Sequence, residues 1–97
     1  MLENIELEVD TKKNLKIISA EKDTSMKDLV LGEAKNVIDN NLTIPVIDRA
    51  ENYSSLIIDV DTDMKKKIKN YCNNQDVRLR DFWVECVNRI LEEGYND

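Results

Sequence analysis

Residues 15–30, LKIISAEKDTSMKDLV, contain the end of one helix and the beginning of the next, and this junction decides the fold. The apolar spacing before the junction predicts a short amphipathic helix over residues 11–22. Ser25 follows a polar interruption and precedes Asp28 by three positions, which resembles a capping box with Asp in place of Glu. A second helix is therefore expected to begin after Ser25 and to run to about Asn40.

Two segments outside this helix pair have the pattern of β-strands. Residues 4–9 alternate polar and apolar side chains, so Ile5, Leu7 and Val9 are expected on one face and the glutamates on the other. Residues 55–60, SLIIDV, form the second strand-like segment. A helical pattern follows each of them, which predicts a strand-helix-helix unit in each half.

The rest of the chain contains a connection and two more helical stripes. Residues 40–54 hold several Asn residues and the chain's one proline, which predicts a connection. Its apolar part, residues 42–47, is expected to pack on a surface or to form an edge strand. Helical spacing returns over residues 64–72 and, more regularly, over residues 79–91. Gly94 stands where the C-cap of the last helix is expected.

The two halves of the chain repeat each other. The tripeptide VDT at residues 9–11 recurs at 60–62, and DLV at 28–30 corresponds to DFW at 81–83. A half with a single strand cannot satisfy the backbone groups of that strand, so the two strands are expected to pair as an antiparallel ribbon above four helices. The organisation predicted is a single domain over residues 1–97, with a first repeat at 4–40, a linker at 41–54 and a second repeat at 55–94. The core predicted from the apolar faces consists of Leu7, Val9, Ile18, Leu29, Val30, Val37, Ile58, Val60, Ile68, Phe82, Val87 and Ile90, with Trp83 as a core or partner-facing anchor.

The junction between the first two helices resembles that of the ribbon-helix-helix (MetJ/Arc/CopG-type) family. The family favours a late Ala in its first helix, a Gly-x-Ser turn, and then an acidic residue and two aliphatics. Here these positions are held by Ala20, by residues 23–25 and by residues 28–30. The turn glycine is replaced by Asp23, and by Asp76 in the second half. The resemblance implies a mainly α fold with a two-stranded antiparallel β-ribbon, a tandem ribbon-helix-helix pseudo-dimer in the order β-α-α-linker-β-α-α.

The resemblance also implies a function, namely sequence-specific binding of double-stranded DNA. In that family the outward ribbon residues read base edges in the major groove, and the N-terminus of each second helix holds a phosphate. The chain would then act as a repressor, a plasmid maintenance factor or an antitoxin that regulates its own gene, as a monomeric pseudo-dimer able to assemble further. Carried over to this chain, the reading positions are Asn4, Glu6, Glu8, Ser55, Ile57 and Asp59, and the phosphate-side positions are Ser25, Lys27, Arg78 and Arg80.

The charge of the chain favours an alternative. Its 97 residues carry 14 basic and 20 acidic side chains, a formal net charge of −6. DNA-binding domains whose affinity comes mainly from phosphate contacts are usually basic. Three of the six reading positions are carboxylates. The alternative is an acidic module of the same fold that has lost DNA reading and engages a basic protein partner, as an antitoxin or a DNA-mimic inhibitor.

No enzymatic role, cofactor or metal site is expected. The chain has no His, the commonest general base and metal ligand, and its two glycines form no phosphate-binding loop. Asp59, Asp61 and Asp63 resemble the start of a calcium loop, but its sixth and twelfth positions are Met64 and Asn70. A strand end and a helix N-cap explain these aspartates better.

The remaining features predict a cytoplasmic protein without a membrane segment. No apolar run approaches the ~18 residues of a membrane helix, and the acidic N-terminus lacks the features of a signal peptide. Cys72 and Cys86 lie on apolar helical stripes and are expected to be buried and reduced rather than joined in a disulfide. Residues 65–67, three lysines, are expected to form a solvated helix face.

Overall fold

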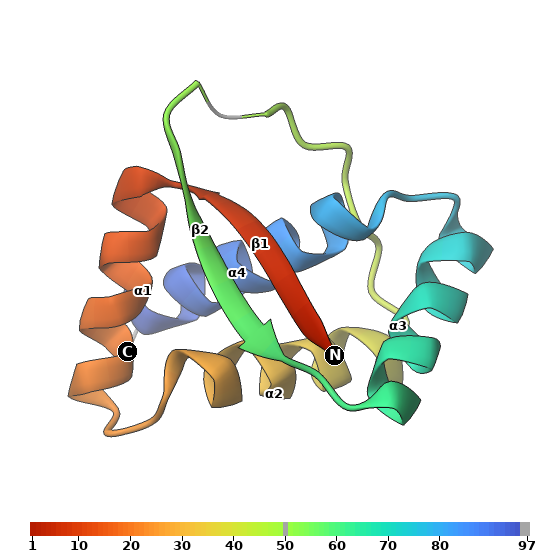
Figure 1. The fold of residues 1–97 in the computed structure, drawn as a ribbon, viewed down its shortest axis with the longest axis horizontal. Helices are drawn as coiled ribbons and strands as arrows, with labels where there is room; N and C mark the ends of the chain where they lie inside the picture. Colours follow the sequence, from red (N-terminus) through yellow and green to blue (C-terminus); the bar gives the residue numbers. More distant parts are fainter. Residues whose placement is uncertain (50, 96–97) are drawn as a thin grey trace.

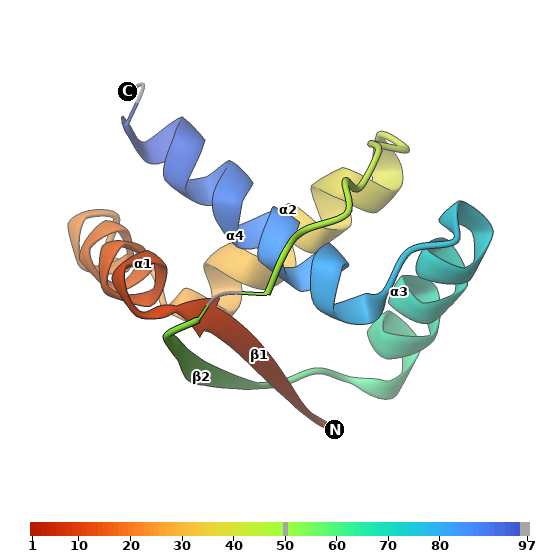
Figure 2. The ribbon, with the colours of Figure 1, turned by 90° about the horizontal axis from the view of Figure 1, so that it is seen from above.

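The computed structural model describes residues 1–49 and 51–95 of the chain. It contains one two-stranded antiparallel sheet and four helices (Figure 1). In chain order the elements are β1 (Leu2–Glu8), α1 (Val9–Glu21), α2 (Met26–Asp39), β2 (Tyr53–Asp59), α3 (Thr62–Gln75) and α4 (Leu79–Tyr95). The helices lie on one side of the sheet, and the other face of the sheet is open (Figure 2).

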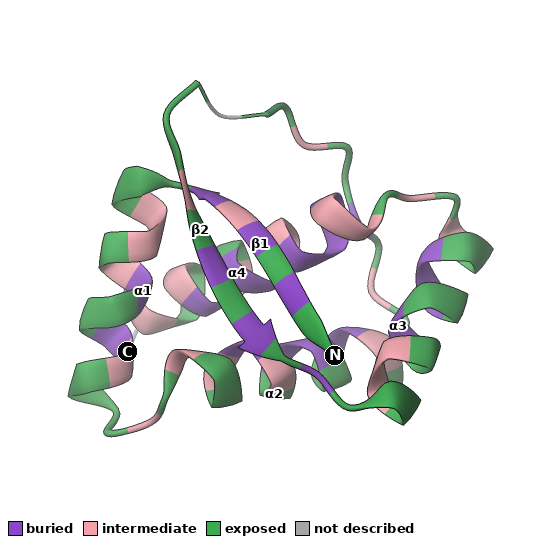
Figure 3. Ribbon diagram, in the orientation of Figure 1, coloured by how far each residue is buried: buried purple, intermediate pink, exposed green. Residues whose placement is uncertain are grey.

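The two strands form an antiparallel ribbon whose register places Ile5 opposite Leu56. Both of these residues are buried, and burial alternates with exposure along each strand (Figure 3). Such alternation is expected for a sheet with one face against a core and one face in water. Glu3 also points inward and is 8% exposed, where it forms an ion pair with Lys65 at 2.9 Å. The expectation of a fully solvated lysine face over residues 65–67 is therefore wrong for Lys65.

The first helix begins earlier than the sequence pattern predicts. β1 ends at Glu8 and α1 begins at the next residue, with no side-chain cap at its start. Because Val9 belongs to the helix and not to the strand, it leaves the inward strand face and is 49% exposed. The prediction of Val9 in the core is wrong for this reason. The turn after α1 contains Asp23 with a φ of 51°, the conformation that a glycine would adopt most readily.

The start of the second helix is as predicted. The Oγ of Ser25 accepts a hydrogen bond from the backbone N–H of Asp28 at 3.0 Å, and α2 begins at Met26, directly after Ser25. Asp61 caps α3 in the same way, through the N–H of Met64 at 2.8 Å, so the helix-cap explanation of that aspartate is confirmed.

The last helix differs from its prediction at its C-terminal end. α4 runs to Tyr95, so Gly94 lies within the helix and the predicted C-cap is wrong. A Cβ at position 94 would lie 2.7 Å from Cδ1 of Ile18 in α1. The glycine therefore has a packing role, since it allows α4 to approach α1 closely.

One hydrophobic core joins all six elements. All but two of the predicted core residues are buried; the exceptions are Val9 and Leu29, which is partly buried. Trp83 is 2% exposed and packs edge to face on Phe82, with ring centroids 5.5 Å apart, so it is a core residue. The core also contains buried residues that the predicted core set left out, namely Ile5, Leu15, Ala34, Ile44, Leu56, Tyr71 and the two cysteines, Cys72 and Cys86, whose burial was predicted separately.

The connection between α2 and β2 packs against the domain without forming a strand in its described part. Ile44 is 4% exposed, and the carbonyl of Leu42 accepts hydrogen bonds from the Tyr71 hydroxyl and from Nε2 of Gln75. Further along, Arg80 donates to the carbonyl oxygen of Ile47 at 2.9 Å. These bonds hold the connection along one side of the molecule (Figure 1).

The predicted fold class, a tandem ribbon-helix-helix pseudo-dimer in the order β-α-α-linker-β-α-α, is wrong for this chain. The structure has six elements, β1-α1-α2-β2-α3-α4, arranged around one two-stranded sheet. The two halves do not pack as equivalent copies, as a pseudo-dimer requires. α1 packs closely against α4, whereas α3 has fewer contacts with α2. The reason is one of length: α4 extends to Gly94 beside Ile18, while α2 ends at Asp39 and gives way to the connection.

Candidate nucleic-acid interface

The outward face of the ribbon is an accessible surface that carries six of the ten predicted site residues. Within the register, Asn4 lies opposite Ile57 and Glu6 lies opposite Ser55. All six predicted reading positions are on this face; Glu6 is partly buried and the other five are exposed. The complete outward face consists of Leu2, Asn4, Glu6, Glu8, Tyr53, Ser55, Ile57 and Asp59.

Two of the three carboxylates on this face have a cationic partner within the chain. Glu6 forms an ion pair with Arg49 at 3.0 Å, and the Arg49 guanidinium also lies over the ring of Tyr53, 5.2 Å from its centroid. The terminal ammonium of Met1 donates to Asp59 at 2.9 Å, and this hydrogen bond lowers the pKa of that carboxyl. The ribbon is therefore less negative than its sequence indicates.

Two lysines add positive charge near the ribbon. Nζ of Lys12, in α1, donates to the carbonyl oxygen of Ser55 at 2.6 Å and to Oγ of Ser54 at 3.3 Å. Lys27, in the first turn of α2, is close enough to Asp59 to contribute to the lowering of its pKa. At the start of α2 the Ser25 hydroxyl accepts from the N–H of Asp28, and the first turn already carries the carboxylate of Asp28 beside Lys27.

The two arginines at the start of α4 are engaged in internal contacts. Both pair with Asp81, which is 1% exposed: Arg78 through Nε at 3.2 Å and Arg80 at 3.0 Å. Arg80 also donates to the carbonyl oxygens of Ile47 and Asp48, at 2.9 and 3.2 Å. The structure thus gives Arg80 a role in holding the connection, while Arg78, with a side chain 66% exposed, remains at the surface.

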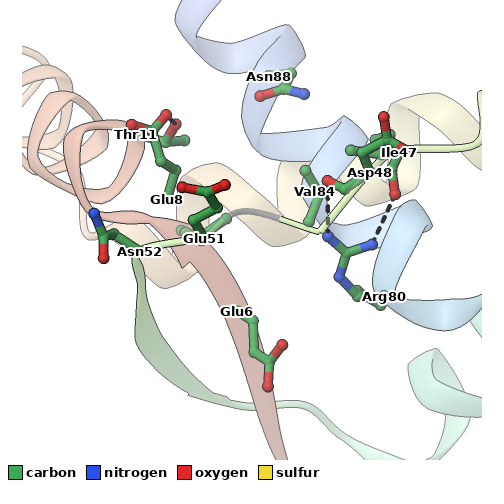
Figure 4. A pocket seen from close by; sticks show the side chains of 11 residues that line it. Glu6, Glu8, Thr11, Ile47, Asp48, Glu51, Asn52, Arg80, Val84 and Asn88 are labelled. Atoms are coloured by element: carbon green, nitrogen blue, oxygen red, sulfur yellow. Dashed lines mark hydrogen bonds between the residues drawn. The ribbon is translucent and has the colours of Figure 1, made fainter.

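A hollow of about 470 Å³ adjoins the ribbon between β1, the connection and α4 (Figure 4). Its carboxylates come from both the strand and the connection: Glu6, Glu8, Asp48 and Glu51. Among the described residues on its wall Arg80 is the one cation, and Figure 4 shows its bonds to the connection as dashed lines. This hollow therefore presents a negative field beside the outward face.

Sequence reasoning missed the importance of Arg49. The residue lies in the predicted linker, where its neighbours Asp48 and Glu51 are acidic, and nothing in the hydrophobic pattern places it near Glu6. Antiparallel pairing of the strands places the end of β1 beside the start of β2, but Arg49 is four residues before Tyr53 and 43 positions from Glu6, so the pairing alone does not predict their contact.

The cysteines offer no reactive centre. Cys72 and Cys86 are both buried and unpaired, which confirms the expectation of buried, reduced thiols. Burial raises the pKa of Cys72 to about 11 and also raises that of Cys86, so neither forms the thiolate that nucleophilic chemistry requires.

The described residues contain neither a metal-binding cluster nor a helix that could cross a membrane. No three side chains of His, Cys, Asp or Glu come together there in a way that would hold a metal ion. None of the helices in the described part of the chain combines the length and the apolar character that a membrane crossing needs. No protein-family model matches the chain, and no match was found among curated proteins or among solved structures.

Proposed function

We propose that this chain is a cytoplasmic, sequence-specific DNA-binding regulator that inserts its two-stranded ribbon into the major groove. The observation that carries the proposal is the open outward face of the ribbon, on which Glu6 and Asp59 are already paired with cations. A two-stranded ribbon has dimensions that the major groove accommodates. Because those pairs lower the negative charge of the face, its carboxylates oppose a phosphate backbone less than the sequence indicates.

The side chains of this face supply groups suited to base edges. The amide of Asn4 matches the donor and acceptor pair of adenine, the hydroxyl of Ser55 bonds to either kind of group, and Ile57 suits the methyl group of thymine. The three are close together, since Asn4 is opposite Ile57 and Ser55 is two positions away on the same face. Lys12 and Lys27 lie at the sides of the ribbon, where the phosphates of a bound duplex would pass.

A selection experiment tests this proposal directly. The full chain is incubated with a random-sequence duplex library at low salt, and retained duplexes are amplified and sequenced. An enriched motif whose affinity falls steeply with salt is expected. The proposal is rejected if no duplex is retained at low salt.

Two variants then locate the surface. Lys27→Gln should weaken binding to all sequences and reduce the salt slope by about 1, whereas Asn4→Ala should relax the preference at one base pair at a cost of about 1–3 kcal/mol. Lys69→Gln is the matched control, because Lys69 is an exposed lysine on α3. Equal losses in Lys27→Gln and Lys69→Gln would show that the ribbon side is not the binding surface.

A second candidate function is supported by the acidic hollow beside β1. Four carboxylates line it against one guanidinium, and the chain as a whole carries a net charge of −6. A protein partner with an exposed arginine or lysine would find complementary charge there, as with an antitoxin or a DNA-mimic inhibitor. This candidate is tested by a pull-down from a cell lysate in which the parent chain is compared with the double variant Glu8→Lys/Glu51→Lys. If the double variant captures a protein as well as the parent chain does, the result counts against the candidate.

A further inference from the structure

We propose that the free edge of β1 binds an extended, basic segment of a partner protein, which adds to the ribbon as a third strand. Strand addition of this kind takes its affinity from backbone hydrogen bonds and its selectivity from the side chains that alternate along the added strand. The inference rests on the second candidate function, an acidic surface that engages a basic partner, and states how that partner is held. It is independent of DNA binding.

The hydrogen-bond pattern of the ribbon leaves every second residue of β1 with backbone groups that β2 does not use. Met1 and Val60 exchange two bonds: the N–H of Val60 donates to the carbonyl oxygen of Met1 at 2.8 Å, and the terminal ammonium of Met1 donates back at 2.9 Å. Bonded and non-bonded pairs alternate along an antiparallel ribbon, so the bonded residues of β1 are the odd-numbered ones. The N–H and C=O groups of Leu2, Asn4 and Glu6 therefore point away from β2, and no described residue outside the ribbon bonds to them.

The corresponding edge of β2 is already in use. Nζ of Lys12, in α1, donates to the carbonyl oxygen of Ser55 at 2.6 Å, and Ser55 is the residue opposite Glu6. This bond agrees with the alternation, because the carbonyl at that position points outward from the ribbon. Figure 1 shows β2 on the side of α1 and β1 on the side of α3. An added strand is therefore expected on β1.

Two hollows along β1 leave space beside this edge. The hollow of Figure 4, of about 470 Å³, contacts β1 at residues 6–8, and a second hollow of about 310 Å³, beside Trp83, contacts it at residues 4–6. None of the described residues that line either hollow belongs to β2. Apolar side chains on the two walls give the inward side chains of an added strand a surface to pack on: Ile5, Leu7, Ile47, Trp83 and Val84.

The charge beside the edge selects a basic segment. Residues bonded across an antiparallel ladder have their side chains on the same face, so the residues that bond to the edge of β1 place their side chains beside Glu6 and Glu8. No ion pair between described residues involves Glu8 or Glu51, the two carboxylates at the outer end of the hollow of Figure 4. Lysine or arginine at alternate positions of the segment complements them.

The same carboxylates disfavour a second copy of this chain as the occupant. Pairing of β1 with β1 of another copy would bring Glu6 and Glu8 of one chain beside those of the other. Like charges across a ladder are destabilising, and charged side chains are a common protection of edge strands against self-association.

One ion pair crosses the edge in the absence of a partner. Arg49 of the connection pairs with Glu6 at 3.0 Å, and the Arg49 side chain is 61% exposed. Exposed ion pairs contribute little, so this pair can open when a cation of the bound segment takes the place of Arg49.

A synthetic peptide tests the mode of binding. The probe is a fluorescein-labelled peptide of alternating Lys and Val, seven residues long to match β1, titrated with the full chain and followed by fluorescence anisotropy. A peptide of alternating Glu and Val is the charge control and should not bind. Two further probes carry N-methyl groups on the Lys amides or on the Val amides. Only alternate amides of an added strand face β1, so methylation in one phase, the Lys amides for an antiparallel strand, should weaken binding at least about tenfold while the other phase retains it.

Proline variants locate the edge. Asn4→Pro removes an N–H that points outward from β1, a position at which an edge strand tolerates proline, and it should weaken peptide binding about tenfold. Ile57→Pro makes the same change at the opposite position on β2 and should leave the peptide affinity unchanged. The methylated peptides need no variant, so they decide the question even where a proline variant fails to fold.

Three results would overturn the proposal. If both methylated peptides bind like the unmodified one, charge alone holds the peptide, and the strand addition fails while the second candidate function stands. If the Lys and Val peptide does not bind, both fail, and the duplex selection is unaffected. If the chain alone forms a dimer by sedimentation that Asn4→Pro abolishes, a second copy occupies the edge.

Discussion

Replacing Gly94 by Ala tests the close approach of α1 and α4, the contact that separates this fold from two equivalent halves. The added Cβ would lie 2.7 Å from Cδ1 and 3.2 Å from Cγ1 of Ile18. Carbon atoms in favourable contact are ~3.5–4.0 Å apart, so Cδ1 must retreat by about 1 Å. Ile18 is 4% exposed and has little space into which it can move.

Two opposing contributions set the size of the effect. An alanine within a helix is favoured over glycine by about 1 kcal/mol, and less near a helix end. Overpacking a buried site costs about 1–3 kcal/mol. Because Cδ1 is the flexible end of its side chain, the cost should be in the lower part of that range. We therefore expect Gly94→Ala to lower the free energy of unfolding by about 1 kcal/mol.

The assay is urea unfolding followed by the fluorescence of Trp83, in a double-mutant cycle with Ile18→Val, which removes Cδ1. In the parent chain, Ile18→Val should lower the free energy of unfolding by about 0.5–1.5 kcal/mol. In the G94A background it should leave the free energy of unfolding unchanged, because the added Cβ occupies the space of Cδ1. Gly32→Ala is the control, since a Cβ there meets nothing within 4 Å, and it should stabilise the chain by about 0.5–1 kcal/mol. The α1–α4 contact is refuted if Gly94→Ala stabilises the chain as much as Gly32→Ala does.

Three further variants or treatments address buried polar groups. Asp81→Asn should destabilise the chain by about 1–3 kcal/mol, measured by urea unfolding, because it leaves the partly buried guanidinium of Arg80 without its carboxylate. Burial raises the pKa of Glu33, so its stabilising contribution is present below the unfolded-state pKa and is lost as the pH rises through the folded-state pKa. Glu33→Gln should therefore be more stable than the parent chain at neutral pH and equal to it in acid, as judged by urea midpoints. With a pKa of about 11, Cys72 should resist iodoacetamide in the native protein and react in urea, as measured by mass spectrometry.

Each of these expectations has an outcome that contradicts it. A loss below about 1 kcal/mol for Asp81→Asn would mean that the carboxylate is not buried between the two arginines. A stability difference for Glu33→Gln that does not change with pH would exclude titration as its cause. Alkylation of Cys72 at the same rate with and without urea would show that the thiol is accessible in the native state.

The sequence predicted local structure well where a side chain acts on its own neighbours. Ser25 begins α2 because its hydroxyl accepts from an amide three residues away, and such a contact is visible in sequence order alone. The alternation over β1 likewise predicted the buried face. Val9 was misplaced because an apolar residue that continues a strand pattern can equally be the first residue of a helix, and only the path of the whole chain decides between them.

The contacts that distinguish the candidate site are long-range, and the sequence did not predict them. The sequence placed Arg80 among the phosphate-side positions and gave no sign that it also donates to the carbonyl oxygens of Ile47 and Asp48, 33 and 32 positions away. Periodicity carries no information about such pairs. Gly94 was read as a C-cap by its position near the end of the chain, whereas its lack of a side chain serves the contact with Ile18.

Arg49 separates the two candidate functions. It neutralises Glu6, lies over Tyr53 and lines the hollow beside Trp83. If the ribbon meets DNA, Arg49→Gln leaves Glu6 uncompensated and should weaken duplex binding about fivefold, or ~1 kcal/mol. If the ribbon and the acidic hollow meet a basic protein, the same variant makes the surface more negative and should strengthen capture by a similar factor. The effects of Arg49→Gln on duplex binding and on protein capture therefore have opposite signs, and Lys69→Gln is the control in both assays. If Arg49→Gln changes neither duplex binding nor protein capture, neither partner contacts this part of the ribbon.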